Sequence, residues 1–130
     1  MRKSITFLSN TTLIVACILL LASCAKKKSD LIAKDWKASE LDLGGNKLSG
    51  DDVGGLYLTL KADSSFTIVE QAKMLDGKWK LNEEGTKLSL SFKEENRVAE
   101  YTVKELTAEK LILEGDEFGM HRIVTYVVKK

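Results

Sequence analysis

The chain has 130 residues, with 20 basic and 19 acidic side chains, two cysteines and a single histidine. This length fits one domain, and the near-neutral charge argues against nucleic acid as a partner, because phosphate binding needs a dense basic face. One histidine, His121, cannot build a multi-histidine zinc site. With 44% hydrophobic and 30% charged residues, the composition is that of an ordered globular protein.

Residues 1–23 have the composition of an export signal. They contain no acidic residue, begin with Arg2 and Lys3, and continue into an apolar run over residues 13–22. A membrane-spanning helix needs about 20 apolar residues, so this run is too short to span a bilayer. A basic start followed by a short apolar run is typical of a secretory signal peptide, which we predict over residues 1–23. The alternative is a helix buried in a protein core.

The apolar run ends in Leu21-Ala22-Ser23-Cys24, which resembles the lipobox of bacterial lipoproteins. The resemblance implies cleavage before Cys24, a diacylglyceryl thioether on its sulfur and acylation of the new N-terminus. Several acyl chains hold a protein on a membrane stably, whereas one chain binds only marginally. The alternative is an ordinary signal peptide in which Cys24 is incidental. Loss of Cys17 with the signal and lipidation of Cys24 leave no free thiol, which excludes disulfides and cysteine nucleophiles.

The segment that follows, residues 24–30, has almost nothing to bury, and we predict a lipidated tether there. Its lysines at positions 26, 27 and 28 either lie on anionic head groups or belong to a solvated spacer. In the lipoproteins that this N-terminus resembles, Ala25 rather than aspartate after the lipidated residue favours the outer membrane. The absence of an acidic pair implies a periplasmic face. We therefore expect a lipid-anchored protein of a Gram-negative cell envelope, at the outer membrane and facing the periplasm.

After residue 30 the hydrophobic pattern has period 2, as in half-buried β-strands. Leu56, Leu58 and Leu60 share one face of such a run, and Trp79 alternates with Lys78 in another. The pattern predicts about eight strands, over residues 36–43, 56–60, 65–69, 77–81, 88–92, 98–106, 110–114 and 120–128. Short turns separate these strands. We therefore expect an all-β fold, a small up-and-down antiparallel meander closed into a barrel over residues 31–130.

Two segments fall outside the strand pattern. Residues 44–55 form a long, glycine-rich connection, which we expect to be a mobile flap. Ser29 is expected to cap a short helical turn over residues 31–33, and this turn would plug one end of the barrel.

Four segments carry a resemblance to a known family. They are residues 33–37 (Ala-Lys-Asp-Trp-Lys), 57–66, 77–81 (Gly-Lys-Trp-Lys-Leu) and 87–90. Together with the lipobox, they resemble the small lipocalin-like lipoproteins of Bacteroidetes over residues 31–128. The resemblance implies an eight-stranded antiparallel barrel with an apolar interior. It implies a fold, and a fold alone does not determine a function.

The interior of the predicted barrel is the candidate ligand site. Its expected lining residues are Trp36, Leu58, Phe66, Trp79, Leu90, Tyr101 and Tyr126. A barrel of about eight strands holds either side chains or one small ligand, so these residues line a cavity or fill the core. We expect a non-enzymatic envelope protein that binds a small apolar or amphipathic ligand. The alternative is a protein-binding or inhibitor module that acts through its outer surface.

No catalytic residue, metal or cofactor is expected. His121 is the one side chain suited to proton transfer near neutral pH, but no nucleophile can be placed beside it, and we expect it in the barrel wall. The acidic pairs at 51–52, 83–84 and 94–95 fall in turns, whereas glycoside hydrolysis needs two carboxyls across a cleft. Asp51, Asp52 and Asn46 lack the alternating register of a calcium loop, and the glycine pairs match no phosphate-binding motif.

Overall fold

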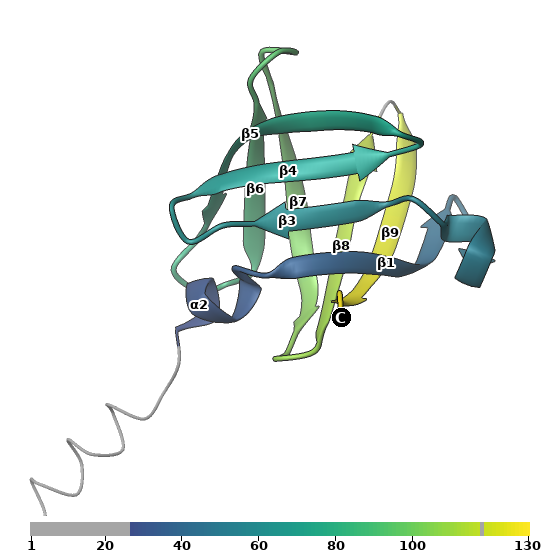
Figure 1. Ribbon diagram of the computed structural model, residues 1–130, viewed down its shortest axis with the longest axis horizontal. Coiled ribbons are helices and arrows are strands. Elements are labelled where there is room, and N and C mark those ends of the chain that lie inside the picture. The colour runs from purple at the N-terminus through teal and green to yellow at the C-terminus, as the bar shows by residue number, and fades with distance from the viewer. Residues whose placement is uncertain (1–26, 118) are drawn as a thin grey trace, which may run out of the picture.

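The computed structural model describes residues 27–117 and 119–130 and contains nine strands in one sheet (Figure 1). The strands are β1 (Asp35–Leu43), β2 (Asn46–Ser49), β3 (Tyr57–Leu60), β4 (Ser65–Glu70), β5 (Lys73–Leu81), β6 (Lys87–Phe92), β7 (Arg97–Leu106), β8 (Lys110–Glu117) and β9 (Met120–Val128). A short helix, α2 (Lys28–Ile32), precedes them, and the 3₁₀ helix η1 (Gly50–Val53) follows β2. The predicted signal peptide and Cys24 lie outside the described residues.

Eight of these strands form a closed antiparallel barrel. From β3 to β9 each strand pairs with the next along the chain, and β1 pairs with β3 on one side and β9 on the other. β9 runs beside the whole of β1, from Trp36 opposite Val128 to Leu43 opposite Arg122. β2 pairs with the second half of β1, on the same edge of β1 that pairs with β3 in its first half. Closure joins the first and last strands, so the predicted all-β, up-and-down barrel is confirmed.

The period-2 pattern produces the barrel core because alternate side chains of each strand point inward. Leu58 and Leu60 on β3 are buried, whereas Thr59 between them is partly exposed. The largest fully buried side chains come from α2 and from five strands; they are Trp36, Phe66, Ile32, Leu58, Leu60, Leu88, Leu90 and Leu111. Removal of this apolar surface from water is the main driving force that closes the sheet.

The helix α2 covers one end of the barrel, which we call the closed end (Figure 1). Ile32 is completely buried, and its carbonyl oxygen accepts a hydrogen bond of 2.8 Å from the indole Nε1 of Trp36. Nζ of Lys28 donates to the carbonyl oxygen of Glu84 in the β5–β6 turn, at 2.8 Å. The predicted helical turn is therefore present, but it begins at Lys28. The predicted cap is wrong, since Lys27 stands at the N-cap and no side chain caps the helix.

Residues 44–55, expected to lie outside the strands as a mobile flap, contain regular secondary structure. They contain β2, which pairs with β1 through Leu48 opposite Leu41, and η1, in which Val53 is buried. These apolar side chains pack on the core and order the segment. β5 also begins earlier than predicted, at Lys73, because Gln71 and Ala72 both have positive φ, 52° and 66°. Two such residues form the tight hairpin turn that matches the twist of the flanking strands.

Candidate functional site: the mouth of the barrel

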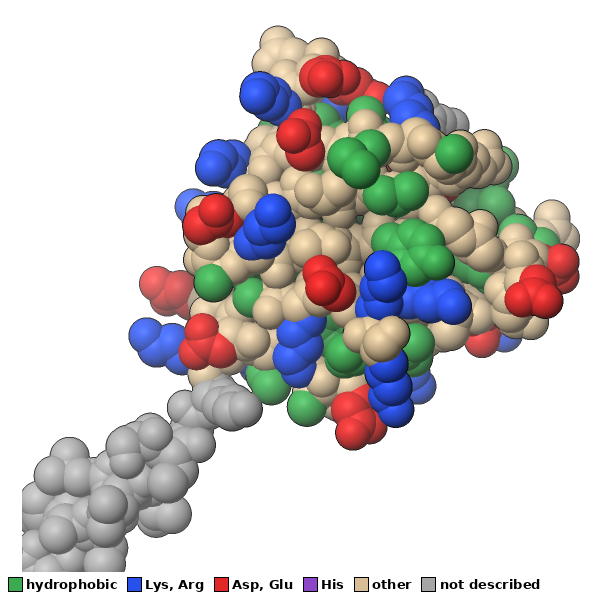
Figure 2. Space-filling view, viewed as in Figure 1, with side chains coloured by type: hydrophobic (Ala, Val, Ile, Leu, Met, Phe, Trp, Pro, Cys, Tyr) green, Lys and Arg blue, Asp and Glu red, His purple; other side chains and the backbone are tan. Residues whose placement is uncertain are grey.

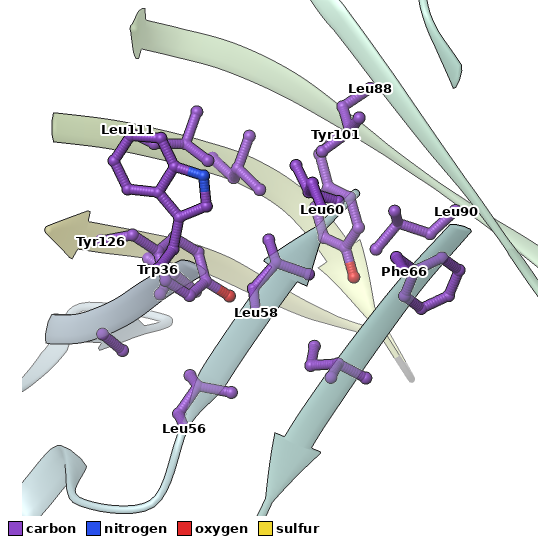
Figure 3. Packing of buried hydrophobic residues seen from close by; sticks show 14 of the residues in the cluster. Trp36, Leu56, Leu58, Leu60, Phe66, Leu88, Leu90, Tyr101, Leu111 and Tyr126 are labelled. Carbon is purple, nitrogen blue, oxygen red and sulfur yellow. The ribbon is translucent and has the colours of Figure 1, made fainter. Parts of the chain in front are cut away.

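The interior of the barrel is filled by the side chains that the sequence placed there (Figure 3). All seven candidate lining residues are buried, namely Trp36, Leu58, Phe66, Trp79, Leu90, Tyr101 and Tyr126. The cavity among Leu58, Leu90, Tyr101 and Tyr126 measures about 10 Å³, close to the volume that one water molecule needs. A ligand larger than water therefore needs another site or a rearranged core.

Both tryptophans have structural hydrogen bonds. The indole Nε1 of Trp36 donates to Ile32 in α2, and that of Trp79 donates to the carbonyl oxygen of Lys61, each at 2.8 Å. Neither ring borders the small interior cavity. The two residues therefore fasten the closed end of the barrel, where α2 and the β3–β4 turn meet the strands.

A larger pocket opens at the opposite end of the barrel, which we call the mouth. Its volume is about 370 Å³, and its apolar floor consists of Ile68, Leu75 and Phe92. Polar side chains complete the lining: Glu70, Gln71, Lys73, Glu95, Arg97 and Glu117. These residues come from β4 and β5, from β6 and β7, and from the end of β8. The pocket is thus built where three hairpins end, with apolar surface below and charge above.

An ion-pair network lies beneath this pocket and contains Arg122, Glu117 and Glu70. Nη1 of Arg122 donates to Oε2 of Glu117 at 2.6 Å, and Nη2 donates to Oε1 of Glu70 at 2.9 Å. The side chains of Arg122 and Glu117 are each only 11% exposed. The hydroxyl of Tyr101 donates to the other oxygen of Glu117, at 2.8 Å. The network therefore joins β4, β7, β8 and β9 across the barrel.

Arg97 adds a further charge above the apolar floor of the pocket, and together with the ion-pair network it forms what we call the charged layer. Its guanidinium lies 4.1 Å from the ring centroid of Phe92, a cation–π contact, and its Nε donates to Glu95. Its Nη1 also lies 3.7 Å from Oε1 of Glu117. Phe92 in turn meets Phe66 edge to face, with 5.2 Å between the centroids. Arg97 thus places a cationic surface directly beside an aromatic one.

The ionisation of this layer follows from its surroundings. Burial raises the pKa of Tyr101, and the negative charge of Glu117 raises it further, so the phenol is neutral and acts as a donor. Burial likewise raises the pKa of Tyr126. Burial opposes the charge on Arg122, but Glu70 and Glu117 outweigh it, and its pKa is raised. Beneath the mouth, Arg122 is therefore charged, whereas Tyr101 and Tyr126 are neutral phenols buried in the interior.

His121 lies on the outer face of β9, near the β8–β9 hairpin at the mouth end of the barrel. Its Nδ1 is 3.0 Å from Oδ1 of Asp116, and its Nε2 is 3.1 Å from Oε2 of Glu114. These contacts, that with Asp116 first, raise the pKa of His121. No cluster of His, Cys, Asp and Glu suited to a metal ion occurs among the described residues. The histidine is therefore paired with two carboxylates and has no nucleophile among its recorded hydrogen-bond partners.

None of the seven predicted lining residues lines the mouth pocket. The sequence analysis missed the charged residues at this end of the barrel, among them Glu70, Arg97 and Glu117 in the pocket and Arg122 beneath it. Each occupies an inward position of its strand, in register with apolar core residues. β8 offered a signal, because extending the period-2 pattern of Leu111 and Leu113 to the end of the strand places Glu117 at an inward position. β9 offered none, because it is apolar on both faces and its pattern does not show whether Arg122 points inward. The pairing of Arg122 with Glu70, which is 52 residues away in the chain, cannot be predicted from the local sequence.

A closed antiparallel barrel with a helix across one end and a pocket at the other has a lipocalin-like fold. The crystal structure of a lipocalin-like protein from Bacteroides uniformis matches this chain with a TM-score of 0.58 and 13% sequence identity. The match covers 76% of this chain and 99% of that protein. No family model and no curated protein sequence matches the chain. Within the described residues, no helix has both the length and the apolar composition to span a membrane.

Proposed function

We propose that this protein is a non-enzymatic, lipid-anchored protein of the cell envelope that binds a small amphipathic ligand at the mouth of its barrel. The observation that carries the proposal is the pocket of about 370 Å³ with an apolar floor and a charged rim. Small-molecule sites typically measure about 300–1,000 Å³ and combine apolar walls with a few placed polar groups. A lipocalin-like barrel also fits a ligand-binding role.

The two parts of the pocket have different roles in binding. Ile68, Leu75 and Phe92 offer apolar surface, and each Å² of such surface removed from water contributes about 25 cal/mol. Arg97 and Glu117 are charged groups held in place by neighbouring contacts, so they orient a polar end without reorganising. The ligand is therefore expected to place its apolar part on the floor and its polar part at the rim.

The described chain enters the barrel at the end opposite the mouth. The chain reaches the barrel through α2, which contacts the β5–β6 turn at the closed end. The mouth is formed at the β4–β5, β6–β7 and β8–β9 hairpin ends. A lipid on Cys24 would hold the closed end near the membrane and leave the mouth open to the aqueous space. We propose that this space is the periplasm and that the anchor lies in the outer membrane.

Leu75 and Met74 offer a matched test of the ligand site. Leu75 lines the pocket, whereas its neighbour Met74 lies on the outer wall and is 68% exposed. We expect Leu75→Trp to fill the pocket and weaken binding of an amphipathic dye about tenfold, and Met74→Trp to leave binding unchanged. Fluorescence titration and native mass spectrometry with a panel of dyes and fatty acids measure the effect. No uptake by the wild-type protein would refute ligand binding, and equal affinity of the two variants would refute the site.

Lipidation is tested independently of the ligand. We expect the wild-type chain to fractionate with membranes and to carry the mass of a diacylglyceryl and an acyl group on Cys24. Cys24→Ala is expected to leave uncleaved precursor or to release the domain from the membrane. The lipid anchor would be contradicted if the wild-type chain and Cys24→Ala fractionated alike and the wild-type chain carried no added lipid mass.

A further inference from the structure

A lysine-rich groove runs along the outer wall of the barrel, away from the mouth. Its volume is about 690 Å³, and it lies over β1, β3, β9 and the β7–β8 turn. We call it the lysine groove; its lining includes Lys37, Tyr57, Glu109, Val127, Lys129 and Lys130. Figure 2 shows Lys and Arg side chains gathered on this part of the surface, over β1 and near the C-terminal end.

The lysine groove combines positive charge with apolar surface. Its lining includes Lys37, Lys129 and Lys130 but a single acid, Glu109. Among the described residues, the recorded salt bridges of lysine involve Lys73, Lys104 and Lys110, and none of the groove lysines. Unneutralised lysines beside apolar side chains are the composition of a surface that meets an anionic, partly apolar partner.

The apolar part of the groove is accessible. Val127 is 37% exposed on the outer face of β9, and Nζ of Lys129 lies 4.9 Å from the ring centroid of Tyr57. Tyrosine and lysine together are typical of the membrane–water interface, where the ring sits at the head groups and the ammonium contacts phosphate. This chemistry fits a lipid surface.

The position of the groove relative to the proposed anchor identifies the membrane as its partner. The backbone N–H of Lys129 donates to the carbonyl oxygen of Asp35, the first residue of β1, at 2.9 Å, so the groove borders the closed end. Cys24 is three residues before Lys27, and an extended chain covers at most about 3.6 Å per residue. A lipid on Cys24 therefore restricts the closed end to within roughly 11 Å of the bilayer surface.

We propose that the lysine groove docks on anionic lipid head groups of the membrane that holds the Cys24 anchor. This inference rests on the lipid-anchoring part of the proposed function and is independent of ligand binding at the mouth. Docking through the groove would place the side of the barrel, rather than its end, against the bilayer. The mouth would then open parallel to the membrane surface and stay accessible to a soluble ligand.

The test uses the full chain, expressed with its signal in bacteria, purified and reconstituted into vesicles. One preparation contains phosphatidylcholine alone, and the other contains phosphatidylcholine with phosphatidylglycerol. Val127→Cys carries a polarity-sensitive fluorophore in the groove, and Val98→Cys carries it on the outer face of β7, where Val98 is 65% exposed. We expect a blue shift and protection from an aqueous quencher at position 127 on the anionic vesicles only, and no change at position 98.

Charge reversal identifies the lysines as the cause. Each Lys near an anionic surface changes the affinity about fivefold, so loss of three positive charges lowers the docked-to-undocked ratio roughly a hundredfold. Replacing Lys37, Lys129 and Lys130 by Glu also adds three negative charges and is expected to lower the ratio by more than that. The matched control, Lys78→Glu with Lys80→Glu, reverses two exposed charges on β5 and should leave docking intact. Molar salt should abolish the signal at position 127, because it screens charges beyond a few Å.

The outcomes separate docking from anchoring. Mass spectrometry of the purified chain reports the lipid on Cys24 by itself. If that lipid is absent, the anchor is contradicted. The same two labels are then read in a Cys24→Ser background, so that the introduced cysteine is labelled and Cys24 is not, after mixing the chain with each kind of vesicle. The docking proposal would be overturned if the fluorescence of the label at position 127 were the same on neutral and anionic vesicles, whether or not Cys24 is lipidated. That result would favour an acidic protein as the occupant of the groove.

Discussion

Replacing Glu117 by glutamine removes one charge from the network beneath the mouth while keeping the shape of the side chain. Glu117 accepts hydrogen bonds from Arg122 and Tyr101 at 2.6 and 2.8 Å, and its side chain is only 11% exposed. Breaking a buried ion pair by removing one partner costs about 3–5 kcal/mol, because the other charge is left uncompensated. Arg122 keeps its contact with Glu70, so we expect Glu117→Gln to lower the free energy of unfolding by about 2–3 kcal/mol.

The same reasoning predicts the outcome of a double-mutant cycle. Arg122→Met removes the cation and leaves Glu117 with Tyr101 and the more distant Arg97, at a cost of about 2 kcal/mol. In the double variant no unpaired charge remains between these positions, so its cost should be about 2 kcal/mol less than the sum of the two single costs. A coupling free energy of that size indicates that the pair acts as one unit.

Equilibrium urea unfolding, followed by far-UV circular dichroism, measures all four proteins of the cycle. The exposed pair Lys110–Glu105, with 3.5 Å between its charged atoms and side chains nearly half exposed, provides a control cycle on the outer wall. Its coupling should stay below about 0.5 kcal/mol, as is usual for surface pairs. Additive costs for Glu117→Gln and Arg122→Met would refute the idea that the mouth network is a coupled, desolvated unit.

The remaining predictions concern the wall of the barrel. Gly77→Ala should cost about 3 kcal/mol in urea unfolding, because its Cβ would lie 1.8 Å from a backbone oxygen of the neighbouring strand. Gly44→Ala, with φ +57° and open space around it, should cost only about 1 kcal/mol. NMR titration should give His121 a pKa above 6.5, and this pKa should be lower in the variants Asp116→Asn and Glu114→Gln. Since folding raises this pKa, protonated His121 should stabilise the folded state fully below pH 6.5, and this contribution should disappear as the pH rises through the pKa of the folded state. A His121 pKa that is not raised in the folded protein would contradict its pairing with the two carboxylates.

The fold could be predicted from the sequence because the same period governs nearly every strand. Alternation of the kind seen at Leu58, Thr59 and Leu60 has one physical solution, a sheet with one buried face, and eight such segments with short turns close on themselves. The prediction failed over residues 44–55, where β2 is only four residues long and its burial depends on Leu48 alone. A strand that short has too few apolar positions to show a period, and its pairing with β1 supplies the order.

The candidate site was harder to predict because its chemistry contradicts the pattern that revealed the fold. The strand over residues 120–128 is apolar on both faces, so its inward face cannot be assigned from the pattern, and the strand predicted over residues 110–114 ends before Glu117. A charge at an inward position, such as that of Arg122, is acceptable only if an oppositely charged partner reaches it. The partner here, Glu70, lies 52 residues earlier in the chain. Such a pairing is a tertiary property. The strand register alone can show that a partner is required, but not which residue supplies it.

The ion-pair network of Arg122, Glu117 and Glu70 also explains how so small a barrel can have a pocket at one end without an internal cavity of ligand size. Below Arg122 the side chains fill the space, as the residual cavity of about 10 Å³ shows, and this packing holds the strands together without disulfides. Above it, the strands end in hairpins whose inward residues no longer meet across the barrel, and the pocket forms there. The pair of Arg122 and Glu117 lies at this boundary, where it resists entry of apolar groups into the core and offers charge to a polar end. Selectivity for amphipathic over purely apolar ligands is therefore expected to depend on this pair, and Arg122→Met should shift it towards apolar ligands in the same titrations.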